Sequence, residues 1–429
     1  MNAISTVAGN GLAGYSGDGG LATAATIRNP SAIILDASTS DVYFIDGENY
    51  RVRKITKTTG FISTIAGTGV SGYSGDGGPA TAAQISTAIG LALEPLSGNI
   101  YIADSENYRI RMITKSTGFI TTVAGTGVSG FSGDSGLATL AKISYSTDIA
   151  IYASAGLLYI ADVGNNIIRM ITLSTGVITT VAGKALSKGY SGDGSAATSA
   201  TLASPSSVDV NPSTGDIYIA DSGNVVIRMV TKSTGVISTI AGTGVAGYSG
   251  DGGPATASHI SFSSAVRVDP STSDVYVDDT DNCCIRLISK KTGVITTVAG
   301  SAMGGCGYDG DGMLATSALL LYPSSFAINT DIGAFYISDS GNNRIRSVFE
   351  KVSVPSVTSK PSASPATPRP TRTPAPTGPT APPTAKPSGP SPNPTYRPTG
   401  PTAVPTGPTA KPNTSPINPG TCRLLSTRS

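Results

Sequence analysis

The chain has 429 residues, of which 52 are Gly, one is His, none is Trp, and 13% are charged. Length alone suggests two or three ordinary domains, but this composition is typical of many short strands joined by glycine-rich turns. From Pro355 to Ser429 there are eight basic and no acidic residues, whereas the first 354 residues carry 21 basic and 27 acidic ones. A mildly acidic body lacks the basic face that nucleic-acid binding needs, and no apolar run is long enough to span a membrane.

The first predicted element is a strand at Ile4–Ala8, which opens six copies of Ile-(Ser/Thr)-Thr-(Val/Ile)-Ala-Gly spaced by 58 residues, with one spacing of 59. A second string, Tyr-x-x-Asp-x-x-Asn-x-x-(Ile/Val)-Arg, follows in every period. Similarity at a fixed period indicates a repeat architecture. Met1 lies three residues before the first copy, so no signal peptide precedes it; the N-terminus is either that of a cytosolic protein or incomplete.

Each period predicts four short strands separated by turn residues. In the second period these strands are Gly90–Leu93, Ile100–Ala103, Arg109–Thr114 and Phe119–Ala124. Strands of four to six residues in groups of four are typical of propeller blades. A lone twisted sheet cannot bury both of its faces, whereas six sheets arranged radially can. The sequence therefore predicts an all-β, six-bladed β-propeller.

The last blade indicates how the ring closes. It supplies only Phe326–Ile328, Ala334–Ser338 and Arg344–Phe349 before the proline-rich segment begins. The missing fourth strand is Ile4–Ala8, which has no blade of its own. We expect this strand to pair with Arg344–Phe349 and to hide two sheet edges at once.

At these residues the sequence resembles the NHL-repeat family. The resemblance rests on Tyr101-Ile102-Ala103-Asp104, Asn107 and Arg109-Ile110-Arg111, followed by Thr122-Val123-Ala124-Gly125. A subtype with a Gly-Tyr-Ser-Gly-Asp-Gly-Gly-Pro-Ala-Thr loop is matched by Gly72–Thr81 and Gly247–Thr256. The resemblance covers residues 1–351 and implies a six-bladed propeller, but such propellers host enzymes, receptors and interaction modules alike.

The repeated Asp and Arg stand seven residues apart across the turn between the second and third strands. We interpret them as a fold-holding network in which Asp caps the turn and Arg reaches a carboxylate or carbonyl of an adjacent blade; a ring of functional charges is the alternative. A site that recognises one ligand is usually asymmetric, which favours the structural interpretation. The residues are Asp46, Asp104, Asp162, Asp221, Asp279, Asp339, Arg53, Arg111, Arg169, Arg228, Arg286 and Arg346.

The long loop between blades also repeats an aromatic residue and an Asp, as in Tyr73 and Asp76, ahead of an Ala-Thr-x-Ala segment. We expect a short helix with Asp near its N-terminus and an aromatic ring that pins the loop to the blade. Calcium binding is the alternative, although each loop usually offers one carboxylate where a calcium loop offers three or more. These loops and the turns between second and third strands emerge on the same face, which we nominate for binding.

The inner strands break the repeat in three places. Asp209 and Arg267 stand where other blades carry Ile or Ala, and Asp148 stands where others carry small residues. Because inner strands line the central channel, we expect the three charges to cluster at its mouth. An ion pair between Asp209 and Arg267 is the favoured interpretation, and an anion or metal site is the alternative.

The cysteines break the repeat in blade five. Cys283 and Cys284 lie on the nominated face, as does Cys306 in the following loop, so we predict a disulfide to Cys306, with Cys284 as the assigned partner and Cys283 as the other choice. Free thiols are equally compatible with the sequence. The only histidine, His259, is expected at the surface of a loop, which leaves no basis for a Ser-His-Asp triad or a zinc site.

From residue 352 to 429 the chain is rich in Pro, Thr and Ser and has almost nothing to bury, so we predict a disordered tail or an O-glycosylated stalk. These features together predict a monomeric, non-catalytic scaffold at the cell surface or outside the cell. It would bind protein or glycan on its loop-rich face, without nucleic acid, membrane span or cofactor. The alternative is a metal-dependent, lactonase-like hydrolase with its site at the channel mouth, where Asp148 and Asp209 are the candidate ligands.

Overall fold

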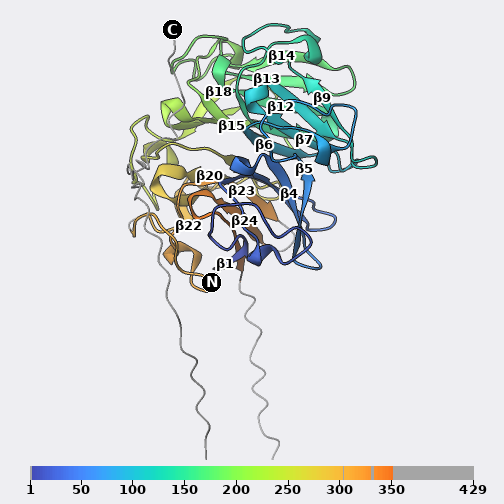
Figure 1. The fold of residues 1–429 in the computed structure, drawn as a ribbon. Coiled ribbons are helices and arrows are strands. Elements are labelled where there is room, and N and C mark those ends of the chain that lie inside the picture. Colours follow the sequence, from blue (N-terminus) through green and yellow to red (C-terminus); the bar gives the residue numbers. More distant parts are fainter. Residues whose placement is uncertain (1, 303, 330–332, 351–429) are drawn as a thin grey trace, which may run out of the picture. The chain divides into compact units, whose positions relative to one another are not determined.

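A computed structural model describes residues 2–302, 304–329 and 333–350, which belong to one compact unit from Met1 to Ser356. The described part is all-β and forms six radial sheets (Figure 1). The predicted six-bladed propeller is confirmed. The predicted tail at 352–429 lies outside the described residues. Within the described ranges, no helix has the length and hydropathy that crossing a bilayer requires.

The strands of the first three blades run in chain order from the channel outwards. Blade one holds β2 (Pro30–Leu35), β3 (Val42–Asp46), β4 (Arg51–Thr56) and β5 (Phe61–Ala66). Blade two holds β6 (Ala88–Leu93), β7 (Ile100–Asp104), β8 (Arg109–Ile113) and β9 (Ile120–Ala124). Blade three holds β11 (Ser146–Tyr152), β12 (Leu157–Asp162), β13 (Ile167–Thr172), β14 (Val177–Ala182) and the added edge strand β10 (Gly136–Leu137).

The last three blades follow the same plan. Blade four holds β15 (Pro205–Val210), β16 (Ile217–Asp221), β17 (Val226–Val230) and β18 (Ile237–Ala241). Blade five holds β19 (Val266–Val268), β20 (Val275–Asp279), β21 (Cys284–Ile288) and β22 (Ile295–Ala299). Blade six holds β23 (Pro323–Asn329), β24 (Ala334–Asp339), β25 (Arg344–Glu350) and β1 (Asn2–Ala8).

The only helices of the described residues are three-residue 3-10 turns. One stands in each loop between blades: η1 (Ala22–Ala24), η3 (Ala80–Ala82), η5 (Ala138–Leu140), η8 (Ala197–Ser199), η10 (Ala255–Ala257) and η12 (Ala315–Ser317). One follows each second strand: η2 (Gly47–Asn49), η4 (Ser105–Asn107), η7 (Val163–Asn165), η9 (Ser222–Asn224), η11 (Thr280–Asn282) and η13 (Ser340–Asn342). The remaining one, η6 (Ala153–Ala155), joins β11 to β12.

The N-terminal strand closes the ring as predicted. β1 pairs antiparallel with β25, with Ile4 opposite Val348 and Ser5 opposite Ser347. Figure 1 shows the blue β1 beside the orange strands of the last blade. The inner strands contact one another in succession, and β23 contacts β2, so the circle of inner strands is complete. Two chain segments more than 300 residues apart therefore share one sheet.

The core is divided into six hydrophobic clusters, one between each pair of neighbouring blades. The repeated Ile of the outer strand is fully buried in every copy, as Ile4 and Ile62 illustrate. Burying such a side chain contributes about 1.5–3 kcal/mol. Because each cluster takes side chains from two blades, no blade can bury its hydrophobic residues without its neighbours.

The loops between blades also protect the sheet edges, which the sequence did not reveal. The loop that enters blade two runs along its outer strand, where Gly77 N–H donates to the Ile120 carbonyl at 2.8 Å and Ile120 N–H donates to the Gly78 carbonyl at 3.0 Å. Equivalent bonds occur in the other blades, and in blade three this loop segment is regular enough to form β10. Backbone groups that would otherwise invite edge-to-edge pairing are thus satisfied.

Candidate functional site

Each blade contains a buried arginine that ties the incoming loop to the sheet. In blade two, the Arg111 guanidinium is fully buried; its Nη2 donates to Asp76 Oδ1 at 2.6 Å and its Nη1 to Asp104 Oδ2 at 3.4 Å. Its Nη atoms also donate to the carbonyls of Ser74 and Gln84 at 2.8 and 2.7 Å. One side chain therefore satisfies the carboxylate of the second strand, the carboxylate of the loop, and two loop carbonyls.

The pattern recurs in all six blades. The distance from arginine to the loop carboxylate lies between 2.5 and 2.7 Å in every copy. The distance from arginine to the second-strand carboxylate is 2.9–3.7 Å in five copies. Among the described residues, Arg169 and Asp162 of blade three form no such pair within 4 Å, and burial raises the pKa of Asp162 to about 7. Buried guanidinium groups require such partners, which supports a structural role for the network.

Two details of the network differ from the sequence interpretation. Asp104 makes no side-chain cap to η4; its Oδ1 accepts the Asn107 side chain at 2.9 Å and the Ser86 N–H at 2.8 Å. The loop Asp76 does not cap η3 either, because its carboxylate faces Arg111. Arginine reaches the loop that enters its own blade rather than an adjacent blade.

The loop carboxylate is held from both sides. Asp76 Oδ2 accepts the Thr122 N–H and the Tyr73 hydroxyl, each at 2.9 Å. Burial alone would raise the pKa of Asp76, but the bonds from Thr122, Arg111 and Tyr73 lower it below its ordinary value of 3.8. Tyr73 thus pins the loop to the outer strand. The described residues contain no group of three or more His, Cys, Asp and Glu side chains arranged to hold a metal ion.

The interblade loops and the turns after the second strands meet at one end of the blades, which we call the loop face. Asn107 Nδ2, for example, donates to the Gly72 carbonyl at 2.8 Å. One loop position exposes an aliphatic side chain in each described copy, with 54–69% of its surface accessible. These residues are Leu12, Val70, Val128, Leu186 and Val245; the sixth position, Met303, lies outside the described residues.

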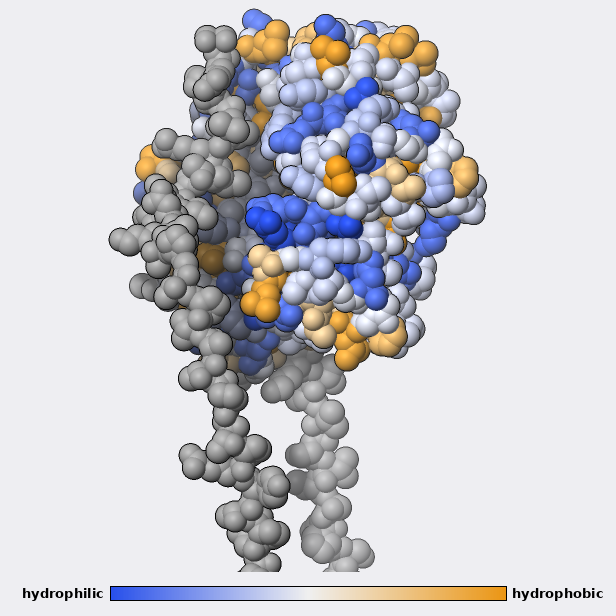
Figure 2. Space-filling model, in the orientation of Figure 1, coloured by the Kyte–Doolittle hydropathy of each residue, from blue (hydrophilic) through white to orange (hydrophobic). Residues whose placement is uncertain are grey.

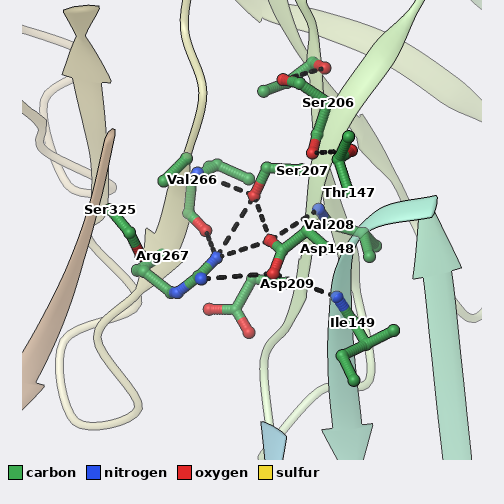
Figure 3. A network of polar contacts seen from close by, with 12 residues as sticks. Thr147, Asp148, Ile149, Ser206, Ser207, Val208, Asp209, Val266, Arg267 and Ser325 are labelled. Carbon is green, nitrogen blue, oxygen red and sulfur yellow. Dashed lines mark hydrogen bonds and ion pairs between the residues drawn. The ribbon is translucent and has the colours of Figure 1, made fainter. Parts of the chain in front are cut away.

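At the channel, the structure brings Asp148, Asp209 and Arg267 together, as Figure 3 shows. The predicted ion pair between Arg267 and Asp209 is wrong, because Arg267 Nη1 lies 2.9 Å from Asp148 Oδ2 instead. Ser207 completes this contact: its hydroxyl donates to Asp148 Oδ2 at 2.5 Å and accepts from Arg267 Nη1 at 3.2 Å. Asp209 Oδ2 instead accepts a hydrogen bond from the Val268 N–H at 2.8 Å.

A fourth charged residue near the channel, Asp278, was not predicted from the sequence. It stands in β20 where other blades carry Ala103, Ala161 or Ala220, and its side chain is fully buried. Its carboxylate accepts the Ala265 N–H and the Ser264 hydroxyl, each at 2.5 Å. Burial raises the pKa of Asp278 to about 7. The sequence does mark this residue, because Asp278 replaces the Ala that stands before the repeated Asp in three other blades.

The Cys284–Cys306 disulfide assignment is also wrong. Cys283 is joined to Cys306, with Cα atoms 5.5 Å apart, and Cys284 is a buried free thiol. Cys283 has a left-handed backbone (φ 55°) at the end of η11, next to the loop, whereas Cys284 begins β21 and faces the interior. Burial raises the pKa of the Cys284 thiol, which keeps it protonated.

No family model matches the chain. Human teneurin-4 is 32% identical over 247 residues, which cover 52% of this chain and 8% of teneurin-4. The chain thus spans less than a tenth of this relative. Two solved structures share the fold over 81% of the chain and 76% of their own length. They are a structural genomics protein of unknown function from Bacteroides thetaiotaomicron (16% identity, TM-score 0.60) and an auxiliary nutrient binding protein from Bacteroides ovatus (17% identity, TM-score 0.59).

Proposed function

We propose that the protein is a non-catalytic binding scaffold that recognises a protein partner through its loop face. The observation that carries the proposal is the exposed aliphatic residue at the same position of every described interblade loop. Isolated exposed apolar residues are ordinary on protein surfaces, and on the side of the molecule that Figure 2 shows, orange areas are scattered among blue and white residues. The repeated loop position is different from the repeated Asp and Arg, which are used inside the fold: in the five described copies its side chain faces solvent, so it is available to a partner as an apolar anchor.

A protein partner fits this face better than a glycan. Sugars are commonly recognised by free aromatic faces, and in three of the interblade loops an arginine covers one face of the tyrosine ring. The Arg51 guanidinium lies 3.6 Å from the centre of the Tyr15 ring, and Arg109 lies 3.7 Å from that of Tyr73. Aliphatic anchors surrounded by polar residues are typical of protein interfaces. A binding role also agrees with the fold shared with an auxiliary nutrient binding protein.

We further propose that the protein works outside the cell or at its surface and that its blades are NHL repeats. The Cys283–Cys306 bridge supports an oxidising compartment. The Thr- and Pro-rich composition after residue 352 is typical of extracellular stalks. The repeat strings and the six-bladed fold support the family assignment.

The test compares variants on the two ends of the blades in the whole chain. The triple variant Val70→Asp, Val128→Asp and Val245→Asp alters the loop face. The control Leu96→Asp changes an exposed aliphatic residue in the turn between β6 and β7, at the other end of the blades. Extracellular proteins of the source organism are passed over each immobilised chain. We expect a partner that wild type and Leu96→Asp retain and the triple variant loses; equal retention by all three, or retention of no protein by wild type, would overturn the proposal.

The hydrolase alternative is less well supported by the geometry. A cation between Asp148 and Asp209 would have to displace the Arg267 guanidinium from Asp148. Calorimetric titration with calcium, manganese and zinc tests this directly. Micromolar binding that disappears in Asp209→Ala would overturn the non-catalytic assignment in favour of a metal site.

A further inference from the structure

The central channel contains a cavity of about 230 Å³ lined by the inner strands of all six blades. Apart from Asp209 and Arg267, the lining residues are Ile, Leu, Val, Ala and Pro, and polar atoms make up about half of the surface that the cavity exposes. Asp209 and Arg267 supply the only charged side chains among the described lining residues. In blades one to three the lining comes from the ends of the inner strands, as with Leu35 and Leu93. The cavity therefore lies towards the end of the channel opposite to the loop face.

The two charged lining residues are not equivalent. The Arg267 guanidinium already donates to Asp148, Ser207 and the Val266 carbonyl, which accepts from Nη1 at 2.7 Å. Asp209, by contrast, forms no ion pair within 4 Å in the part of the chain that the structure describes. Figure 3 shows its carboxylate apart from the Arg267–Asp148 contact. Its carboxylate accepts hydrogen bonds from the backbone N–H groups of Val268 and Val210, but no cationic group pairs with it directly among the described residues.

The charges around Arg267 do not balance. Asp148, Asp209 and Asp278 all act on this single guanidinium. The carboxylate of Asp148 forms the ion pair with Arg267. The carboxylate of Asp278 accepts hydrogen bonds from the Ser264 hydroxyl and the Ala265 N–H. The negative charge that remains faces the cavity through Asp209.

We propose that the channel binds a small alkylammonium cation, whose charge meets the Asp209 carboxylate and whose alkyl group lies against the aliphatic wall. An anion would meet the uncompensated carboxylate and no free cationic group. A bare metal ion prefers several carboxylate or carbonyl ligands, and Asp209 is the only carboxylate among the described lining residues. The ligand is small because the cavity is below the roughly 300–1,000 Å³ of pockets that hold drug-sized molecules. This site is separate from the loop face and does not depend on the function proposed for it.

The experiment titrates the whole chain with n-butylammonium, and with butyrate and butanol as probes of equal length but different charge, by calorimetry. We expect saturable binding of butylammonium that weakens at least about tenfold in Asp209→Asn, a loss of about 1.4 kcal/mol. The matched control is Glu48→Gln, which removes one negative charge from an exposed pair with Arg28. Its affinity is expected to equal that of wild type.

A second variant tests the cavity itself. Ala92→Ile enlarges a residue that lines the cavity and also borders the core between blades two and three. Blade one already carries Ile34 at this position, opposite the repeated Tyr in both blades. Weaker butylammonium binding without a change in melting temperature supports the site. The proposal is overturned by unchanged affinity in Asp209→Asn, by butyrate binding as tightly as butylammonium, by absence of saturable binding, or by calcium displacing butylammonium.

Discussion

Replacing a loop carboxylate measures whether the repeated network holds the fold. In Asp76→Asn, the single remaining acceptor oxygen can serve either Arg111 or the Thr122 N–H and Tyr73 hydroxyl, but not both pairs. Losing hydrogen bonds to a charged group costs about 1.5–3 kcal/mol. The larger cost of about 3–5 kcal/mol for an abandoned buried charge is not expected, because Asp104 still faces Arg111.

Urea unfolding of the whole chain is the assay. Asp76→Asn should lower the free energy of unfolding by about 1.5–3 kcal/mol, whereas Glu48→Gln, in an exposed ion pair, should lower it by less than about 1 kcal/mol. Because the folded pKa of Asp76 is lowered, its contribution is complete above its ordinary pKa of 3.8 and is lost as the pH falls through the folded value. The difference between wild type and Asp76→Asn should therefore shrink below about pH 4.

Calcium distinguishes the structural network from a cation site. If the loops bind calcium, the ion will stabilise wild type, and the cost of Asp76→Asn will disappear in excess EDTA. A structural network predicts the same cost with calcium and with EDTA. A cost no larger than that of Glu48→Gln would refute the reasoning from buried arginine to fold stability.

Three further predictions concern closure, redox state and the channel. Ile4→Ala should lower the free energy of unfolding by about 2–5 kcal/mol, as should Ile62→Ala, because both are fully buried at the same repeat position; a negligible effect of Ile4→Ala alone would mean that β1 is undocked. Intact mass after alkylation should show two labels gained on reduction in Cys284→Ser and none in Cys283→Ser, and the reverse result would restore the pairing assigned from sequence. Butylammonium binding should weaken as the pH falls through about 6, because burial raises the pKa of Asp209 to that value and only its ionised form attracts the cation; pH-independent affinity in calorimetry would contradict this.

Repetition made the fold predictable. Six copies of a strand and five complete blades leave one vacancy, so Ile4–Ala8 could be assigned to the last sheet from the sequence alone. The observed β1 extends from Asn2 to Ala8 and differs only at its first residues. The strand ends elsewhere differ by a residue or two, as in β6, which begins at Ala88 rather than Gly90.

The candidate site was less predictable because it depends on side-chain direction. Arg267 could be assigned to the channel, but its choice of Asp148 over Asp209 depends on how far the guanidinium reaches across two blades and on Ser207 between them. Cys283 and Cys284 are neighbours in sequence, and their difference lies in the structure: Cys283 stands at the end of η11 next to the loop that carries Cys306, whereas Cys284 begins β21 as a buried thiol. The loop segments that cover the outer strands show no alternation of apolar and polar residues. Their pairing with the sheet edges was therefore not predicted from the sequence.

The loop face and the channel both exist only if the first strand closes the ring, and a cysteine pair tests this closure most directly. Ser5 and Ser347 are paired across β1 and β25, with their Oγ atoms 3.3 Å apart. In the double variant Ser5→Cys and Ser347→Cys, mild oxidation should give a cross-link within one chain, found by peptide mapping. The control pair Ser5→Cys and Ser97→Cys should give none. No cross-link, the same yield as the control, or a link only between two chains would contradict closure.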